Sequence, residues 1–562
     1  MQRHKIILSW LTVFMVTFSL GWFVNSSLAN DNESTYLKID KGLFYLKEVF
    51  ETVSRNYVEE LDPEVLSKSA IEGMLKEFDP YTVFFEDPGS HQMRMITRGK
   101  YGGVGMEIGF QNQQVTVIAP MEGTPAQRAG VRAGDIIVEI DGTPIHDLSL
   151  EETSQRLRGK IGTSVAIEIE RPGLDSPVKL ELVREEIVIK DVSYADFIEP
   201  GTAYIRLAAF SDKAGQELKE AVQQLQARER IQRVILDLRG NPGGLLTAAV
   251  EVANVFLPPG QLVVSTRGSH ESENKFFTKE APLLPTVPLV VLVNESSASA
   301  SEIVAGAIQD LDRGVLVGSE TFGKGLVQKV YPVDRVSQAY LKITTAKYYV
   351  PSGRSIQKED YKKNTRVFTN LADSVEYNQS TDYFTHNGRV VHGGGGIHPD
   401  VEVTEEDLSV YLRNLTGRGL LFQFAVDYLS SHPALKQAPA VSISDQILDD
   451  FSAYLGQQQF DFEIEGEAQL KQFLDIARKQ QYNADIQDLV DVTLQKLAAL
   501  KAGKFNAYRE RIRHLLEAEF AEKLDGPSAR IRSMLSHDEQ LQQSLVVLQN
   551  ITQYQEILAI RK

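Results

Sequence analysis

Four serines crowd one short stretch in the middle of the chain, and one of them could act as a nucleophile. The stretch NESSASASEIVAGAIQD, residues 294–310, lies between an apolar run and a helical pattern and contains Ser296, Ser297, Ser299 and Ser301. A structural role is available, because Ser299 and Glu302 have the spacing of a capping box. A capping box needs only one serine, however. The first amides of a helix can also hold a developing oxyanion, so the stretch fits either a cap or a nucleophile.

A serine hydroxyl needs a base, and a lysine is the best candidate. No G-x-S-x-G motif occurs, and none of the 10 histidines sits in a recognisable partner motif. Lys324 lies in GSETFGKGLVQ, where glycines permit a tight turn. A desolvated lysine beside an alcohol can take its proton. At the usual pKa near 10.4, only about one lysine in a few thousand is neutral at pH 7. The apolar residues Phe322, Leu326 and Val327 could supply the burial that lowers this pKa. An isolated lysine in a turn is ordinarily just solvated.

A second group of residues is typical of peptide binding. Gly103-Val104-Gly105-Met106 alternates glycine with apolar residues, which can turn several backbone amides toward a terminal carboxylate. A peptide would then add as an extra strand along residues 104–108. Any tight turn needs glycine, but AGVRAGDIIVEIDG follows at a suitable distance and includes a hairpin signal at Asp141-Gly142. Together these segments resemble a PDZ domain over about residues 98–186.

Composition excludes several classes of function. A chain of 562 residues is too long for one core. The 76 acidic and 59 basic residues give a net charge of -17 with no long basic run, so nucleic acid is not an expected partner. There is no cysteine, which excludes disulfides, thiol catalysis and cysteine zinc sites.

The amino terminus has the pattern of an export segment. MQRHK precedes an apolar run over residues 6–24, and Ser27-Leu28-Ala29 offers small residues for cleavage after Ala29. The run is also close to the length of a membrane span. Residues 1–29 are therefore predicted to be a signal peptide or, less favoured, a membrane anchor. In both cases the rest of the chain is expected in the periplasm or cell envelope.

Beyond this segment the chain divides by pattern into four regions. Residues 30–97 carry apolar residues at helical intervals, and residues 98–186 form the PDZ-like segment. Strands and helices alternate over residues 187–404, which predicts a layered α/β core. Residues 405–562 are almost entirely helical in pattern. The predicted fold class is multidomain α/β, with a PDZ-like β module inserted before a layered α/β core and with helical N-terminal and C-terminal regions.

The motifs taken together resemble one family of proteases. VILDLRGNPGGLL, NESSASASEIVAGAIQD, TFGKGLVQ, TTAKYYVPSGRSIQ and GIHPDVEV follow the PDZ-like segment in this order. The combination resembles the carboxy-terminal processing (tail-specific) serine proteases of the bacterial envelope, peptidase family S41, over about residues 36–402. This resemblance implies an exported serine endopeptidase that binds protein substrates by their carboxy-terminal tails and cleaves them at or near those tails through an acyl-enzyme. It implies no metal and no cofactor.

The resemblance also assigns the catalytic residues. It implies that Ser299 is the nucleophile, with Ser297 as second choice, and that Lys324 is the general base. Gln328 would position the lysine, one helical turn further on if that segment is helical. For Glu302 a helix-capping role is favoured over a catalytic one.

Binding roles follow in the same way. The oxyanion hole maps to the backbone amides of Ala300 and of Gly243 or Gly244. The carboxylate-binding turn is made of Gly103, Val104, Gly105 and Met106. Asp237 and Arg239 could form an ion pair that braces the oxyanion loop.

A rival interpretation is a non-catalytic scaffold or chaperone of the envelope, in which the PDZ-like module binds tails and the serine turn only caps a helix. The coexistence of serine, lysine and glutamine motifs favours the enzyme. The helices at both ends of the chain could mediate homo-oligomerisation or simply pack on the core. An adaptor protein is a further open partner, and contact with a membrane is expected only through the N-terminal segment.

Overall fold

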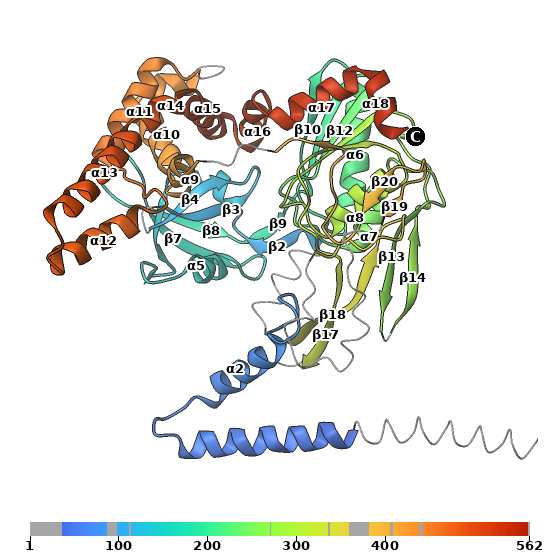
Figure 1. Ribbon diagram of the computed structural model, residues 1–562, viewed down its shortest axis with the longest axis horizontal. Helices are drawn as coiled ribbons and strands as arrows, with labels where there is room; N and C mark the ends of the chain where they lie inside the picture. Colours follow the sequence, from blue (N-terminus) through green and yellow to red (C-terminus); the bar gives the residue numbers. More distant parts are fainter. Residues whose placement is uncertain are drawn as a thin grey trace, which may run out of the picture. The chain divides into compact units, whose positions relative to one another are not determined.

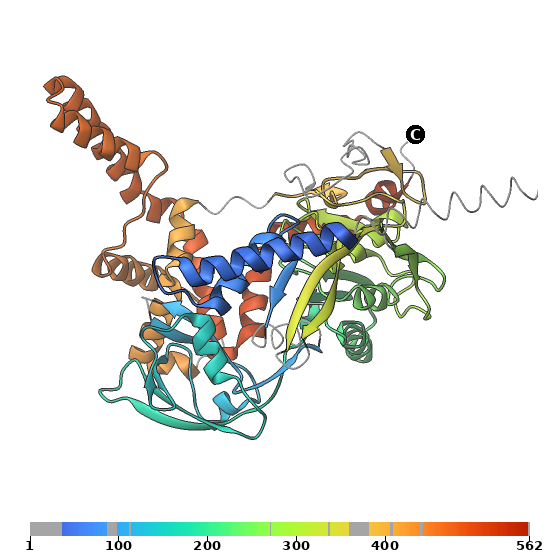
Figure 2. The same cartoon turned by 90° about the horizontal axis from the view of Figure 1, so that it is seen from below.

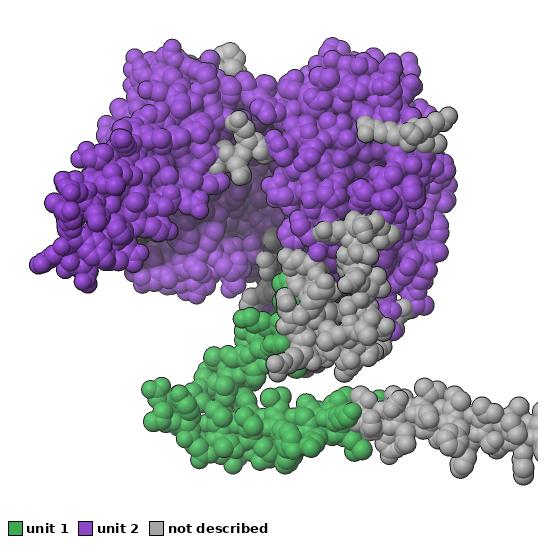
Figure 3. Space-filling view, in the orientation of Figure 1, with its two compact units in different colours: residues 1–84 green, residues 85–562 purple. Residues whose placement is uncertain are grey.

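The computed structural model (Figures 1 and 2) describes residues 36–86, 98–111, 114–269, 271–334, 338–358, 382–404, 409–437 and 442–559. The chain divides into two compact units, residues 1–84 and residues 85–562, which Figure 3 distinguishes by colour. The predicted export run over residues 6–24 lies outside the described residues. Among the helices of the described part, none is both long and apolar enough to cross a membrane.

Unit 1 is helical, as its sequence pattern predicts. Residues 36–56 form one helix and α2 spans Pro63–Leu75, while the short strand β1 (Val83–Phe85) lies at the unit boundary. Asp62 begins α2 by accepting a hydrogen bond from the Glu64 amide (2.8 Å). The first helix leaves large apolar side chains exposed, among them Leu43 at 59% and Phe44 at 57%. Its apolar face is therefore largely uncovered.

Unit 2 begins with the PDZ-like module. Its sheet has the order β3-β4-β5-β7-β8, with β6 paired to β5, and a separate pair joins β2 to β9. The strands are β2 (Lys100–Gly103), β3 (Met106–Gln111), β4 (Gln114–Pro120), β5 (Ile136–Ile140), β6 (Thr143–Pro144), β7 (Ser164–Glu170), β8 (Val178–Val183) and β9 (Glu185–Val188). Helices α4 (Pro125–Arg128) and α5 (Leu150–Leu157) complete the module.

Local turn chemistry sets this arrangement. Asp141 and Gly142, with φ of 50° and 76°, make the predicted turn between β5 and β6. Strand β3 lies at the edge of the sheet and pairs only with β4 among the described residues. Its other edge is thus a place where a further strand could pair.

A six-stranded sheet forms the α/β core. Its order is β10-β11-β12-β15-β16-β21, parallel except for β10. The strands are β10 (Val192–Glu199), β11 (Thr202–Leu207), β12 (Arg233–Asp237), β15 (Leu289–Val293), β16 (Val315–Gly318) and β21 (Val401–Glu402). The helices α6 (Ala214–Arg228), α7 (Leu246–Ala253) and α8 (Ala300–Asp310) cover one face. This confirms the predicted layered core.

The last helices of the chain cover the opposite face of that sheet. On β15, Val291 and Val293 face the layer of α6 to α8, whereas Val290 and Leu292 pack in a cluster with Leu545 and other residues of the chain's end. The covering helices are α16 (Pro527–Leu535), α17 (Glu539–Gln549) and α18 (Ile551–Leu558), drawn in red in Figure 1. Burial on both faces explains the continuous apolar run of β15.

An antiparallel sheet adjoins the core. Strand β18 pairs with β17 and with β13, which pairs with β14. These strands are β13 (Leu262–Gly268), β14 (Glu271–Phe277), β17 (Leu326–Asp334) and β18 (Ala339–Tyr349), and a small hairpin joins β19 (Asp382–Phe384) to β20 (Val390–His392).

The segment after β21 is helical, as predicted. Its helices are α9 (Val410–Gly417), α10 (Leu420–Ser431), α11 (Asp445–Gln457), α12 (Glu467–Lys479), α13 (Ala484–Ala502), α14 (Lys504–Ala507) and α15 (Arg509–Asp525), with a 3₁₀ turn over Pro433–Gln437. A separate core of α9, α10, α11 and α15 includes Leu448, Phe451 and Phe520. Helices α12 and α13 lie side by side in both views (Figures 1 and 2).

Candidate active site

Ser299 occupies a strained turn between β15 and α8. It precedes the first helical residue, Ala300, with φ of 56° and ψ of -112°. A positive φ is uncommon outside glycine, and such strain persists only where the surrounding structure enforces it. Here both ends of the turn are fixed, because all residues of β15 and α8 are buried. Among the four serines, the surrounding structure thus holds Ser299 in an unfavourable backbone conformation.

The neighbouring serines have structural partners. Ser297 is buried and its Oγ donates to the Leu238 carbonyl oxygen (2.8 Å), while the buried Ser301 Oγ donates to the Asn241 carbonyl oxygen (2.9 Å). Both bonds fasten the serine turn to the segment after β12. Ser296 is exposed, and Ser299 is partly exposed.

A buried carboxylate joins the serine turn to the lysine loop. Glu302 Oε2 accepts hydrogen bonds from the backbone amides of Ser299 (2.8 Å) and Lys324 (2.9 Å). Its Oε1 accepts from the Gly323 amide (2.7 Å) and from Thr321 Oγ1 (2.6 Å). The predicted capping bond to Ser299 is therefore present, but it is one of four. Glu302 also fixes the loop that carries Lys324.

Glu302 is fully buried, and burial raises the pKa of its carboxyl above the ordinary value despite the opposing hydrogen bonds. A buried acid with a raised pKa lowers stability at neutral pH relative to a neutral group. Its four hydrogen bonds to the serine turn and the lysine loop hold these two segments together.

A tyrosine makes a second link between the same two residues. The Tyr348 hydroxyl is in hydrogen-bonding position to the Ser299 carbonyl oxygen (3.0 Å) and to the Lys324 carbonyl oxygen, and its single proton can serve one of them at a time. Tyr348 belongs to β18 and is buried. Ser299 and Lys324 thus share two partners, Glu302 and Tyr348, which places their backbones next to each other.

The surroundings of Lys324 differ in part from the sequence expectation. Leu326 is buried and Val327 is partly buried, but Phe322 is 49% exposed and so covers less than expected. Lys324 itself is partly buried. The segment that carries Gln328 is strand β17, so the idea of a helical turn from Lys324 to Gln328 is wrong. Gln328 Nε2 donates to Thr344 Oγ1 on β18 (3.2 Å).

The glycine-rich loop after β12 lies against Ser299. A Cβ on Gly243 would lie 2.8 Å from both the Ala300 nitrogen and Ser299 Cβ, so only glycine fits at this place. The Gly243 amide itself donates to Asn241 Oδ1 (2.9 Å). Of the two predicted glycine donors, Gly243 already has an acceptor within its own loop.

Asp237 and Arg239 form the predicted ion pair, with Arg239 Nη2 to Asp237 Oδ2 at 2.7 Å. Burial raises the pKa of the Asp237 carboxyl, but the Arg239 guanidinium outweighs it and the net pKa is lowered. Arg239 also pairs with Asp538 (2.6 Å) at the start of α17. Asp538 lies 299 positions further along the chain, so no local pattern predicts this second partner.

Comparisons with known proteins identify the family of the chain. The family model "Peptidase family S41" matches residues 201–367. A carboxy-terminal-processing protease of Bartonella bacilliformis is 38% identical over 355 residues, covering 61% of this chain and 80% of that protein. The chain belongs to the carboxy-terminal-processing protease family.

Other matches cover the rest of the family architecture. A probable CtpA-like serine protease of Staphylococcus aureus (strain MSSA476) is 33% identical over 379 residues, with 66% of this chain and 74% of that protein covered. Further family models match residues 22–88 ("Activating protease CtpB N-terminal domain"), 116–171 ("PDZ domain") and 411–548 ("Probable PDZ-protease, C-terminal helical domain"). The photosystem II D1 C-terminal processing protease overlays with a TM-score of 0.34 at 28% identity, covering 63% of this chain and 91% of that one.

In this protease the turn of the PDZ domain is built around Gly105. Gly105 has φ of 74°, and its carbonyl oxygen accepts from the Met121 amide (2.9 Å) and from Thr124 Oγ1 (2.8 Å). A Cβ on Gly105 would lie 2.4 Å from Thr124 Cβ. Val104 and Met106 are buried, and Gly103 ends β2. Glycine at position 105 is thus required by the turn's own packing, whatever approaches from outside.

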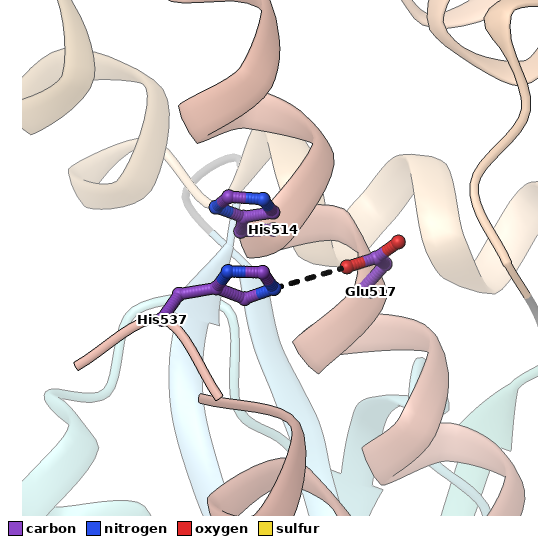
Figure 4. Close-up of side chains that lie close together, drawn as sticks. All are labelled: His514, Glu517 and His537. Atoms are coloured by element: carbon purple, nitrogen blue, oxygen red, sulfur yellow. Dashed lines mark ion pairs between the residues drawn. The ribbon is translucent and has the colours of Figure 1, made fainter. Parts of the chain in front are cut away.

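One cluster of metal-ligand residue types lies apart from Ser299. His514 and Glu517 of α15 and His537, just before α17, place one ligand atom each within 4.8 Å of one another (Figure 4). His537 Nε2 lies 3.9 Å from Glu517 Oε2. The two imidazoles are stacked with centroids 3.3 Å apart and planes at 9°. Imidazole lone pairs lie in the ring plane, so parallel rings do not direct them at one ion. This group would need a ring rotation to bind a metal.

Proposed function

We propose that this chain is an exported serine endopeptidase that cleaves proteins at or near their carboxy-terminal tails, with Ser299 as nucleophile and Lys324 as general base. The observation that carries the proposal is the pair of shared contacts. Glu302 accepts from both backbone amides, and Tyr348 reaches both carbonyl oxygens. A scaffold would have no need to hold a serine at a strained φ next to a lysine loop.

In the proposed reaction, neutral Lys324 Nζ takes the proton of Ser299 Oγ as this oxygen attacks the scissile carbonyl carbon. The carbonyl oxygen becomes an oxyanion, which the amides of Ala300 and Gly244 would receive. We favour Gly244 over Gly243 because the Gly243 amide already donates to Asn241. The Lys324 ammonium then returns its proton to the leaving amine, and water hydrolyses the acyl-enzyme. Gln328 would help to orient the lysine from strand β17.

The dyad is tested by Ser299→Ala and Lys324→Ala, which should each reduce peptide cleavage to background because the two residues act as one unit. Cleavage rates are measured beside circular dichroism and thermal melting. Cleavage near the wild-type rate by either folded variant would contradict the dyad and favour the scaffold. A pH–rate limb near pH 6.5 that disappears when one histidine is replaced would instead indicate a histidine base.

Substrate binding is proposed for the PDZ domain. The amides of residues 103–106 would bind the terminal carboxylate, and the tail would pair with the open edge of β3, whose sheet position supports this role.

Two further proposals concern the ends of the chain. Residues 1–29 would direct export to the periplasm or cell envelope, as a signal peptide or an inner-membrane anchor. The exposed apolar face of residues 36–56 supports homo-oligomerisation through this helix. An adaptor protein is an alternative partner for such an exposed apolar face.

A further inference from the structure

The loop over residues 239–244 is held at its start by the far end of the chain. Arg239 donates to Asp538 through two parallel bonds, Nη2 to Oδ2 at 2.6 Å and Nη1 to Oδ1 at 3.0 Å, and Nη1 also donates to Gln540 Oε1 at 3.0 Å. The Arg239 side chain is 12% exposed and that of Asp538 is 16% exposed. Bidentate pairing of this kind fixes the orientation of the guanidinium as well as its place.

The partner of Arg239 is itself rigidly placed. Asp538 is the N-cap of α17, where Oδ1 accepts from the Leu541 amide (2.9 Å), and Gln540 Nε2 donates to the Val403 carbonyl oxygen (2.8 Å). Helix α17 packs on the core sheet through Leu545 and Leu548. Asp538 therefore holds its carboxylate at the start of a helix that is packed on the core sheet.

The other end of the same loop touches the nucleophile turn. The Asn241 carbonyl oxygen accepts from the Ala298 amide (3.0 Å) and from Ser301 Oγ (2.9 Å). Gly243 lies against Ser299 and the Ala300 nitrogen. A restraint at Arg239 thus acts four residues from Gly243, which lies against Ser299, and five residues from Gly244.

Glycine makes such a restraint necessary. The loop contains Gly240, Gly243 and Gly244, all at positive φ. Glycine residues leave the backbone of a loop more conformational freedom than other residues do. An oxyanion donor, however, must be held within about 2.7–3.1 Å of the developing charge. Beside the bond from the Gly243 amide to Asn241 within the loop, contacts with other segments therefore help to fix its position.

We propose that Asp538 is a positioning residue for the reaction of Ser299: through Arg239 it holds loop 239–244 where a loop amide can receive the oxyanion. The C-terminal helical segment thereby becomes part of the active site's support. This inference rests on the proposed function, in which that loop supplies an oxyanion donor.

Asp538 is a better test position than Arg239. When Asp538 changes, Arg239 keeps Asp237, so no buried charge loses its last partner. Asn is as good an N-cap as Asp, so Asp538→Asn preserves the start of α17 while it removes the charge and the oxygen that accepts from Arg239 Nη2. Asp538→Ala removes the charge and the cap. Ser444→Ala, at the N-cap of α11, is the matched loss of a cap away from Ser299.

The experiment compares the full-length protein and these variants in three measurements. They are kcat and KM on a peptide substrate, the rate at which a fluorophosphonate probe phosphonylates Ser299 with loss of fluoride, and the melting temperature. We expect Asp538→Ala to lower kcat and the phosphonylation rate about tenfold or more, with the ~10²–10³-fold cost of losing a whole oxyanion donor as the upper limit. Asp538→Asn should show a smaller loss of kcat with an unchanged melting temperature. KM should stay within about twofold for both, since ground-state binding is not affected. Ser444→Ala should keep the wild-type kcat.

The inference is overturned if folded Asp538→Asn and Asp538→Ala both react at wild-type rates, or if only KM changes. If Asp538→Ala does not fold, Asp538→Asn alone decides in the same way. Failure of the proposed function looks different, because the wild type would then cleave no peptide or Ser299→Ala would still cleave.

Discussion

At the scale of single residues, Ser299 differs from Ser297 and Ser301 mainly because the hydroxyls of those two serines already bind backbone carbonyl oxygens. Ser297 and Ser301 are consumed by bonds to backbone carbonyl oxygens, and the strained φ belongs to Ser299. The sequence alone could not select one of the four serines at this turn. The partners that distinguish Ser297 and Ser301 lie about 60 positions away in the chain. Family resemblance selected Ser299 as the nucleophile, and this stays a prediction that the contacts of its neighbours support.

Glu302 does more than cap helix α8, because it also binds the loop that carries Lys324. A capping interpretation accounted for its spacing from Ser299 but not for Thr321, Gly323 and Lys324, which have no local pattern with it. The carboxylate uses both oxygens, and an amide has only one oxygen acceptor.

We predict that Glu302→Gln lowers kcat at least about tenfold, because its NH₂ group must face at least one backbone N–H donor, Gly323 in one orientation or Ser299 and Lys324 in the other. This repulsion displaces the segments that Glu302 joins. The loss of about 1–3 kcal/mol from unpaired donors is partly offset by removal of a buried charge, so the melting temperature should change little. Glu295→Gln, at an exposed position of the same turn, is the matched control. A Glu302→Gln enzyme with the wild-type kcat would show that the carboxylate does not position the dyad.

At the scale of elements, strand β12 and the loop that follows it depend on one buried ion pair. Asp237 is 2% exposed and its pKa is held below the ordinary value by Arg239. A lowered pKa means that this carboxylate stabilises the fold above its ordinary pKa range and that the stabilisation is lost as the pH falls through the lowered value.

We therefore predict that Arg239→Met destabilises the protein by about 3–5 kcal/mol at pH 7, because it leaves Asp237 charged and buried without its partner. Toward pH 4 the difference from wild type should shrink, since Asp237 in the variant can take a proton. Urea denaturation at both pH values measures this. Arg228→Met removes an exposed pair with Asp196 (2.8 Å) and should cost about 0–1 kcal/mol. A difference from wild type that grows on acidification would contradict the sign of this argument.

Local elements were largely predictable, and their long-range partners were not. The turn at Asp141-Gly142, the helix after Ser299 and the strand before it follow from turn chemistry and hydrophobic period, which are local properties. Strand β17 was not anticipated, because its outer residues are exposed on both sides and show no clean alternation. Tyr348 and Thr321 went unnoticed because nothing in their local sequence indicates what they contact.

At the scale of the whole molecule, the end of the chain completes the core that its middle begins. Residues of α17 and α18 cover one face of the six-stranded sheet, and the Tyr554 hydroxyl accepts a hydrogen bond from the Leu289 amide (3.0 Å). Such contacts span about 265 positions, far beyond any periodicity. The sequence pattern therefore predicts one helical region over residues 405–562, whereas its last helices pack on the sheet of the α/β core.

The proposed recognition of carboxy-terminal tails would involve the whole enzyme, since the PDZ domain would bind the substrate that the α/β core cleaves. A variant at Gly105 cannot test it: any side chain there collides with Thr124 and strains a φ of 74°, so the turn would distort for internal reasons. The substrate offers the cleaner change. Amidating its carboxy terminus removes the charge that the amides of residues 103–106 would receive, while the peptide's sequence and its scissile bond stay the same.

We predict that the wild-type enzyme cleaves a free-acid peptide with an apolar carboxy-terminal tail faster than the amidated form, by about tenfold in kcat/KM, the worth of roughly 1.4 kcal/mol from one charge-assisted contact. An uncleavable free-acid peptide with the same tail should compete with the substrate, and its amide should compete poorly. The control is a peptide shortened to the residues around the scissile bond, whose free-acid and amide forms should differ little because neither reaches the PDZ domain. Equal cleavage of both full-length peptides would remove carboxylate recognition from the mechanism, and the chemistry of Ser299 and Lys324 would stand without it.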